Sequence, residues 1–191
     1  TNNHVDSKPP FPPFLYIRSG SVFPELEHFV HQTVHFYHLP DTVTVGSRVN
    51  GCKRGVEQHA SLIIYEGSIK CSLERFVKDY PEIRAVFMGT RSSDPYSAKL
   101  SPVCMTDPDW PQILRVNPIL DWSHADVWRL IRKLSLPYCT LYDVGYTSIG
   151  NVEDTRPNPQ LRVVTECGRV EYRPAYTLSD PEAERRGREN R

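Results

Sequence analysis

Short apolar runs alternate with stretches of helical periodicity along this chain, and this alternation limits the fold to a few architectures. Three runs are rich in aromatic and β-branched residues: FLYIR, SLIIY and RAVFM, at positions 14–18, 61–65 and 84–88. Apolar residues three and four positions apart predict helices over 21–38, 68–79 and 121–137. Strands and helices that alternate in this way predict an α/β fold with a mostly parallel sheet.

Capping residues predict where two of these helices begin. Ser21 is the expected N-cap of the first helix, and Pro24 suits its first turn. Ser123 is the expected N-cap of the third helix, with Asp126 three residues later as the acidic partner of a capping box. We expect Pro137 to end the third helix.

The remaining stretches predict how the chain is divided. The first thirteen residues are polar and rich in proline, which favours an extended lead-in over 1–13. A glycine-containing basic stretch interrupts the periodicity, and we interpret 40–60 as an insertion or flexible loop. The stretch 89–118 is expected to be irregular. We therefore predict one domain over 14–178, followed by a charged tail over 179–191 that is mobile or forms a short helix.

Charge and cysteine content argue against several classes of function. Lysine plus arginine equals aspartate plus glutamate, at 23 each, so no general attraction to nucleic acid or anionic membranes is expected. The chain has no C-x-x-C pair, which argues against zinc and a disulfide framework; its cysteines are Cys52, Cys71, Cys104, Cys139 and Cys167. No apolar run approaches a membrane span, and no signal-peptide pattern is present. We expect a cytoplasmic protein that binds small molecules.

Polar residues follow the third apolar run abruptly, in VFMGTRSSDPY. Open α/β folds bind ligands at the carboxyl ends of their strands, where Arg91 and Asp94 are expected to lie. An arginine there can neutralise phosphate oxygens, and an aspartate can hold Mg²⁺. The alternative is an ordinary turn that begins at Asp94 and Pro95.

Other polar clusters have both functional and structural interpretations. In TDPDWP, Trp110 could stack on a planar ring and Asp107 could accept from a ring N–H, or the tryptophan could simply pin a loop. The stretch 141–151 has glycines and hydroxyls that could surround an anion. Arg185 and Arg188 could clamp a phosphate or lie on a solvated end. Cys167, in TECGR, could be a nucleophile or an ordinary loop thiol.

Taken together, these segments resemble one family, the eukaryotic FAD synthases, which are FMN adenylyltransferases of the PAPS reductase-like superfamily. The matching segments are LYIRSGSVFPELEHF, VFMGTRSSDPY, TDPDWP with Arg115, NPILDWSHADVW, PYCTLYDVGYTSIGNVEDTRPNPQLR and YRPAY. They cover most of 14–176. The resemblance implies a Rossmann-like fold of the adenine-nucleotide alpha hydrolase type. It also implies the reaction of ATP with FMN to give FAD and pyrophosphate, with Mg²⁺.

The resemblance also implies roles for particular residues. Asp94 is implied in metal and phosphate binding and in catalysis, with Arg91 beside it on the ATP phosphates. The flavin side is implied to comprise three residues: Asp107, Trp110 and Arg115. Arg185 and Arg188 are implied as catalytic clamps on the FMN phosphate or on the transferring group. No covalent intermediate with the enzyme is needed, so catalysis would consist of aligning two anions and offsetting their repulsion.

One departure from the family, and the segment TECGR, keep two alternatives open. The family begins with a strand, a glycine-rich pyrophosphate loop of the kind NGGKD, and a helix, and we find no such stretch before FLYIR. We therefore expect a fold that lacks this first strand-loop-helix, with a non-catalytic flavin-binding isoform as one alternative. A PAPS reductase that uses Cys167 is the other, although the histidine that follows ECG in that family is Arg169 here.

Overall fold

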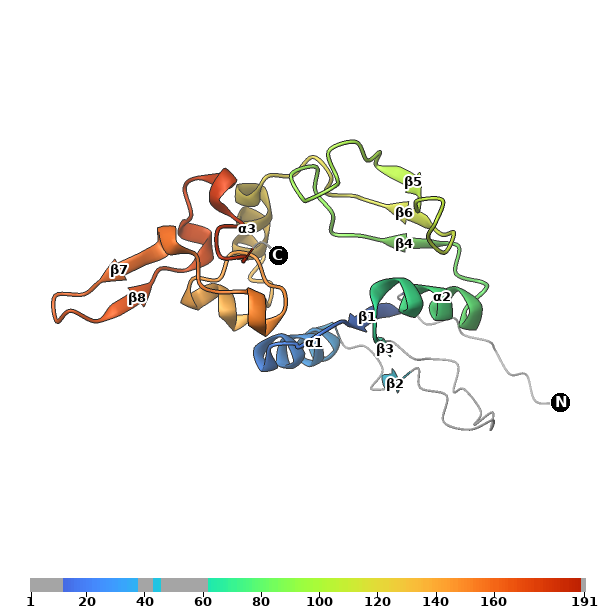
Figure 1. Ribbon diagram of the computed structural model, residues 1–191, viewed down its shortest axis with the longest axis horizontal. Coiled ribbons are helices and arrows are strands. Elements are labelled where there is room, and N and C mark those ends of the chain that lie inside the picture. The colour runs from blue at the N-terminus through green and yellow to red at the C-terminus, as the bar shows by residue number, and fades with distance from the viewer. Residues whose placement is uncertain (1–11, 38–42, 46–61, 190–191) are drawn as a thin grey trace.

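The N-terminal half of the protein contains a parallel three-stranded sheet. The computed structural model describes residues 12–37, 43–45 and 62–189 (Figure 1). The strands of this sheet run in the order β1-β3-β2, and their bounds are Phe14–Arg18, Leu62–Glu66 and Val43–Val45. Both outer strands pair with β3 in parallel. Four consecutive residues of β3 are at most 2% exposed, as expected for a strand that is covered on both faces.

Helices α1 (Pro24–Phe36) and α2 (Ile69–Asp79) cover opposite faces of this sheet. Val34 of α1 packs on Leu62 and Ile64, whereas Phe76 of α2 packs on the alternate residues of β3. Successive side chains of a strand point to opposite faces, so the alternation of β3 residues between the two clusters follows from strand geometry. This part of the chain confirms the predicted α/β layering.

The helix starts were predicted with mixed success. Ser123 caps α3 (His124–Lys133), and Asp126 completes the predicted capping box. Ser21 does not cap α1, which begins at Pro24 with Phe23 as a cap that makes no side-chain bond. Proline fits the first helical position because it has no N–H to lose there, so the helix starts three residues later than predicted. The Ser21 hydroxyl instead contacts Glu153.

A second small sheet corrects the prediction of one mostly parallel sheet and of an irregular 89–118 stretch. Its order is β4-β6-β5, with bounds Ala85–Phe87, Leu114–Val116 and Val103–Met105. β4 and β6 are parallel, and β5 is antiparallel to β6. Among the described strands, β1 and β4 each pair along one edge only, so the sheets do not join. Phe76 of α2 shares one core cluster with Ile113, and Val86 of β4 packs against that cluster, so a shared core connects the two sheets.

Short 3₁₀ turns and one hairpin make up most of the C-terminal region. The turns are η1 (Thr140–Val144), η2 (Val152–Asp154), η3 (Pro159–Leu161), η4 (Ala175–Thr177) and η5 (Pro181–Ala183). The antiparallel hairpin of β7 (Arg162–Val164) and β8 (Val170–Tyr172) projects from this region (Figure 1). Leu141 of η1 and Phe23 form a third core cluster, which joins the region to α1.

The charged C-terminal segment 180–189 is packed into this region. Ala183 is fully buried, and its carbonyl accepts from the Asn158 amide at 2.7 Å. Gly187 accepts from the backbone N–H of Arg156 at 2.8 Å, and a Cβ on Gly187 would lie 2.2 Å from the Arg156 carbonyl oxygen. The segment includes the short helix η5, one of the two predicted outcomes, and is not a free tail.

His124 and Trp128 lie buried on one face of α3. The Trp128 indole N–H donates to Nε2 of His124 at 3.0 Å, so Nε2 must be the acceptor and the neutral ring carries its proton on Nδ1. The pKa of His124 is lowered, mainly because the ring is buried. The carboxylate of Glu184 acts to raise this pKa, and the charge of Arg91 acts to lower it. The neutral imidazole is therefore the form that suits this site.

Several predictions fall on residues that the structure does not describe. These are the lead-in up to residue 11 and most of the predicted insertion at 40–60, of which only β2 is described. The backbone of β2 is a strand rather than a loop, paired with β3 from Val43 to Val45. Across the described ranges, no helix combines the length and the apolar character that crossing a membrane requires.

The core formed by α2 can be tested with one substitution at two positions. Phe76 is 2% exposed and Phe87 is 72% exposed. We expect Phe76→Leu to lower the free energy of unfolding by about 1 kcal/mol, because it leaves space in a packed core. Phe87→Leu, the matched control, should change it by less than about 0.5 kcal/mol. Urea denaturation measures both values, and equal losses would contradict this assignment of the core.

The buried His124 predicts a dependence of stability on pH. Its pKa in the folded protein is lowered below the unfolded value of about 6.5, so the unfolded chain binds more protons. The contribution is therefore complete above about pH 6.5 and is lost as pH falls below it. His124→Gln keeps an acceptor for Trp128 and removes the titration. Between pH 7.5 and 5.5, urea unfolding should show a larger loss for the wild type; parallel losses would refute the assignment.

Candidate functional site

Arg91 and Asp94 form a tight turn just beyond β4. The Asp94 carboxylate accepts from the backbone N–H of Arg91 at 2.9 Å and from its Nη2 at 3.2 Å. The backbone N–H of Asp94 in turn donates to the Arg91 carbonyl. Both sequence interpretations of this motif therefore apply: the motif is a turn, and it presents a guanidinium and a carboxylate at the carboxyl end of a strand.

Glu184, which the sequence analysis did not single out, completes this pair. Its carboxylate oxygens lie 2.7 and 2.8 Å from Nη2 of Arg91, across 93 residues of sequence. The two side chains are 11% and 19% exposed, so water screens the contact only partly. Burial lowers the pKa of Arg91, but hydrogen bonding to Glu184 and the charges of Glu184 and Asp94 raise it above its ordinary value. The guanidinium therefore stays charged.

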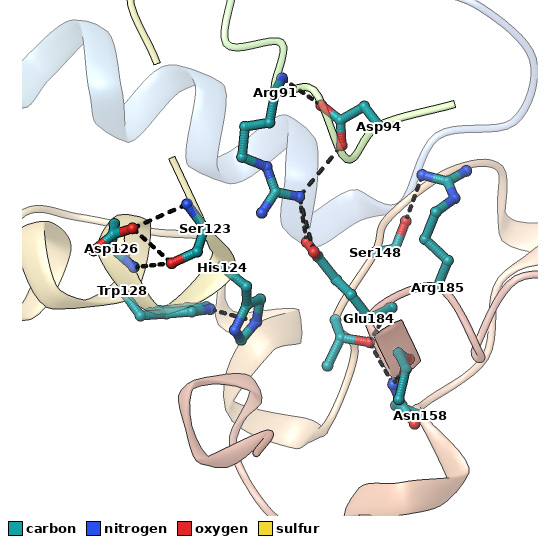
Figure 2. A network of polar contacts seen from close by, with 12 residues as sticks. Arg91, Asp94, Ser123, His124, Asp126, Trp128, Ser148, Asn158, Glu184 and Arg185 are labelled. Carbon is teal, nitrogen blue, oxygen red and sulfur yellow. Dashed lines mark hydrogen bonds and ion pairs between the residues drawn. The ribbon is translucent and has the colours of Figure 1, made fainter. Parts of the chain in front are cut away.

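A polar cavity of about 400 Å³ lies beside this network. Figure 2 shows Arg91, Asp94 and Glu184 meeting near the start of α3, with Arg185 extending away from them. The cavity is lined by Ser92, Ser93, Asp94, Asp121, Trp122, Ser123, His124, Pro181, Glu182, Glu184 and Arg185. Two predicted site residues that are far apart in sequence, Asp94 and Arg185, thus line one cavity.

The two predicted tail arginines have different surroundings. Arg185 is exposed, and its Nη1 lies 3.3 Å from the Ser148 hydroxyl. Arg188 packs its guanidinium over Gly150, where a Cβ would lie 2.1 Å from Nη2, and it lies 3.7 Å from Asp154. Its Nε is buried without a hydrogen-bond acceptor. A buried donor with no partner in the described residues requires an explanation, and a bound ligand would supply one.

The residues predicted for the flavin side gather at the other end of the second sheet. Arg115 contacts Asp107 at 3.5 Å, and Trp110 lies under the amine of Lys70, 6.0 Å from the ring centre. Met105 and Ala85 both pair with Leu114, on opposite sides of β6, so the Asp107 loop lies at the edge of the sheet where β4 begins. These residues do not line the cavity near Arg91. Nε of Arg115 is also buried without a partner in the described residues.

The glycine-rich stretch 141–151 has mainly structural contacts. Gly145 adopts a positive φ of 88°, and a Cβ there would lie 2.5 Å from Tyr172. The backbone N–H of Gly150 donates to the Thr155 hydroxyl at 3.2 Å. This stretch therefore supports the C-terminal segment, and the N–H of Gly150 is already used within the protein.

Cys167 lies in the exposed turn of the β7–β8 hairpin. Its sulfur is 3.1 Å from the Thr165 hydroxyl, and that hydrogen bond lowers the pKa of the thiol. The residue does not line the cavity near Arg91. Within the described ranges, no cluster of three or more histidine, cysteine, aspartate or glutamate side chains could hold a metal by itself.

Comparisons with known proteins identify relatives along most of the chain. The family model of the phosphoadenosine phosphosulfate reductase domain matches residues 3–157. A probable FAD synthase of Caenorhabditis elegans is 38% identical over 92% of this chain and 30% of its own length. A probable FAD synthase of Schizosaccharomyces pombe is 35% identical over 93% of this chain and 58% of its own length. The chain therefore spans about a third to somewhat over half of these relatives.

A solved structure of a similar protein supports the fold. The FMN adenylyltransferase of Candida glabrata, in complex with FMN and the ATP analogue AMPCPP, matches with a TM-score of 0.73 and 26% identity. The match covers 91% of this chain and 68% of that protein. These findings confirm the resemblance to FAD synthases. The chain belongs to the phosphoadenosine phosphosulfate reductase domain family, and within it is similar to the FAD synthases.

Proposed function

We propose that the protein is an FMN adenylyltransferase that transfers AMP from ATP to FMN and forms FAD and pyrophosphate. One observation carries the proposal: the strand-end residue Asp94 and the C-terminal residues Glu184 and Arg185 line one cavity, and Arg91 contacts Asp94 and Glu184 beside it. The chain is also similar to FAD synthases over 92% or more of its length. The chain spans only part of the length of those relatives, so for this chain their activity is a proposal.

The reaction needs charge neutralisation and alignment. An oxygen of the FMN phosphate forms a bond to the α-phosphorus of ATP, and the bond from that phosphorus to the bridging oxygen of pyrophosphate breaks. Both reactants are anions, so positively charged side chains must offset their repulsion and the charge of the pentacoordinate transition state. We assign this role to Arg185 and Arg188. We assign Arg91 to hydrogen bonding with a phosphate group, and Asp94 to the metal-bound nucleotide.

The flavin ring would lie toward the second cluster. The two clusters lie toward opposite ends of the second sheet, whose strand β4 alone spans roughly 10 Å at about 3.3 Å per residue. In FMN the ring and the phosphate also lie at opposite ends, joined by the ribityl chain. Trp110 is suited to stacking, and the unpartnered Nε of Arg115 is a donor for a ring oxygen or nitrogen.

Mg²⁺ fits the residues around the cavity as part of a nucleotide complex. Protein sites for Mg²⁺ commonly use one or two carboxylates together with substrate phosphates and waters. The cavity lining includes the carboxylates of Asp94 and Asp121, which fits this pattern without a three-residue metal cluster. When bound, the ion would stabilise negative charge on the phosphate oxygens. Asp94 also keeps the Arg91 turn in shape.

FAD formation from FMN and ATP is the direct test. We expect the purified chain to form FAD and pyrophosphate with Mg²⁺, and to form none when EDTA replaces Mg²⁺. Asp94→Asn should lower the rate by about 100-fold or more, by analogy with the loss of other groups that stabilise transition-state charge. Asp109→Asn is the matched control: Asp109 is 75% exposed and contacts Lys70, and its rate should stay within about twofold. Chromatography separates the two flavins.

The same assay distinguishes the flavin-binding alternative. A folded chain that quenches FMN fluorescence but forms no FAD would be a non-catalytic flavin-binding protein. Equal loss of activity in the Asp94 and Asp109 variants would refute the role assigned to Asp94. A folded chain that binds neither FMN nor ATP would refute the proposed function as a whole.

Cys167→Ser tests the reductase alternative. A reductase that uses this thiol would lose its activity on substitution. An adenylyltransferase should be unaffected, because Cys167 is exposed in a hairpin turn and does not line the cavity near Arg91. We expect the rate of FAD formation to change by less than about twofold, as for a surface substitution. A loss of FAD formation in a folded Cys167→Ser variant would contradict the assigned site.

A further inference from the structure

Arg91 is held by only one of its three nitrogen atoms. Both oxygens of Glu184 and one oxygen of Asp94 contact Nη2, at 2.7, 2.8 and 3.2 Å. A guanidinium has five N–H donors, so removing the two on Nη2 leaves three, on Nε and Nη1. No acceptor for these three is found among the described residues. In Figure 2 the free Nη1 lies on the side of Ser123 and His124, which both line the cavity, whereas Arg91 itself lies next to the cavity and does not line it.

The backbone that carries the Glu184 side chain is itself held in place by hydrogen bonds from two other side chains. The Thr147 hydroxyl donates to the Glu184 carbonyl at 2.6 Å, and the Asn158 amide donates to the preceding carbonyl, of Ala183, at 2.7 Å. Asn158 and Ala183 are fully buried. A buried amide keeps its hydrogen bonds because breaking them without water is costly. The backbone of Glu184 is therefore fixed before any ligand binds.

A fixed partner on one nitrogen restricts the whole guanidinium, because the group is planar and rigid. Without Glu184, Arg91 would keep only the longer contact to Asp94 within its own turn. With Glu184, the plane is held between two carboxylates from different parts of the chain, and its remaining donors are presented together. Such prealignment lowers the entropy cost of binding a phosphate.

We propose that Glu184 is a positioning residue that holds Arg91 so that its free N–H donors bind a phosphate group of the ligand. This inference rests on the proposed function, since it assumes a phosphorylated substrate in the cavity. The direction in which ligand affinity changes on removal of Glu184 tests this role. Removing a carboxylate near a phosphate site should tighten anion binding if only charge matters, whereas loss of positioning should weaken it.

Two substitutions of Glu184 separate these effects. Glu184→Ala removes both the charge and the contact, and we expect it to weaken FMN or ATP binding by about tenfold or more, as for the loss of a charge-assisted hydrogen bond. Glu184→Gln keeps an acceptor for Nη2, and should bind within about threefold of the wild type. Glu189→Ala is the matched control in the same segment: among the described residues its carboxylate contacts the exposed Arg156, at 3.6 Å, and affinity should not change.

Ligands without phosphate provide the second arm of the experiment. Affinities for FMN and riboflavin are compared by flavin fluorescence, and those for ATP and adenosine by calorimetry, in the full chain. A loss confined to FMN or to ATP supports the proposal and identifies which phosphate Arg91 contacts. Unchanged or tighter binding by Glu184→Ala overturns it. An equal loss for riboflavin or adenosine also overturns it, since the effect would then be structural.

The proposal can be judged even if the proposed function fails. If the wild type binds neither nucleotide, pyrophosphate is titrated together with Mg²⁺ and the Arg91 Nε–H signal is followed in ¹⁵N NMR spectra. We expect that signal to shift in the wild type and in Glu184→Gln, and to shift much less in Glu184→Ala. Equal shifts in all three proteins, or no shift in the wild type, would overturn the positioning role of Glu184.

Discussion

The buried amide of Asn158 fixes the C-terminal segment, and the geometry of the candidate site depends on it. The amide donates to the Ala183 carbonyl and to the Thr147 hydroxyl, and Thr147 donates to Glu184. Because a buried amide is costly to leave unbonded, this chain of contacts permits one position of the segment. The backbone that carries Glu184 is therefore positioned by interactions other than the ion pair of its carboxylate with Arg91.

Sequence patterns predicted the elements whose stabilising contacts are local. The apolar run at 14–18 became β1 with the predicted bounds, and the capping box of Ser123 and Asp126 formed as expected. The expectation for Ser21 was wrong because Pro24 suits the first helical position, where its missing N–H is not needed. The family resemblance was also readable from the sequence, since it is carried by ordered motifs.

Contacts between distant segments could not be read from the sequence. Glu184 lies in a charged stretch without periodicity, and its partner Arg91 is 93 residues away. The strands β5 and β6 have three residues each, too few for an alternating pattern to distinguish them from a loop. For the same reason the residues predicted for the site form two clusters. Each motif specified the conformation of its own turn, but the pairing of β4, β5 and β6 determined at which end of the sheet that turn lies.

The cavity lining carries more carboxylates than arginines, and this limits which form of a phosphate ligand can bind there. The lining has four carboxylates, from Asp94, Asp121, Glu182 and Glu184, and one arginine, Arg185. Arg91 is largely offset by the two carboxylates that contact it. A free polyphosphate would therefore be repelled, whereas a complex with Mg²⁺ has a smaller negative charge and can use a lining carboxylate as a metal ligand. In this environment the value of Arg91 lies in the direction of its free N–H donors more than in its net charge, and direction is what the contact with Glu184 provides.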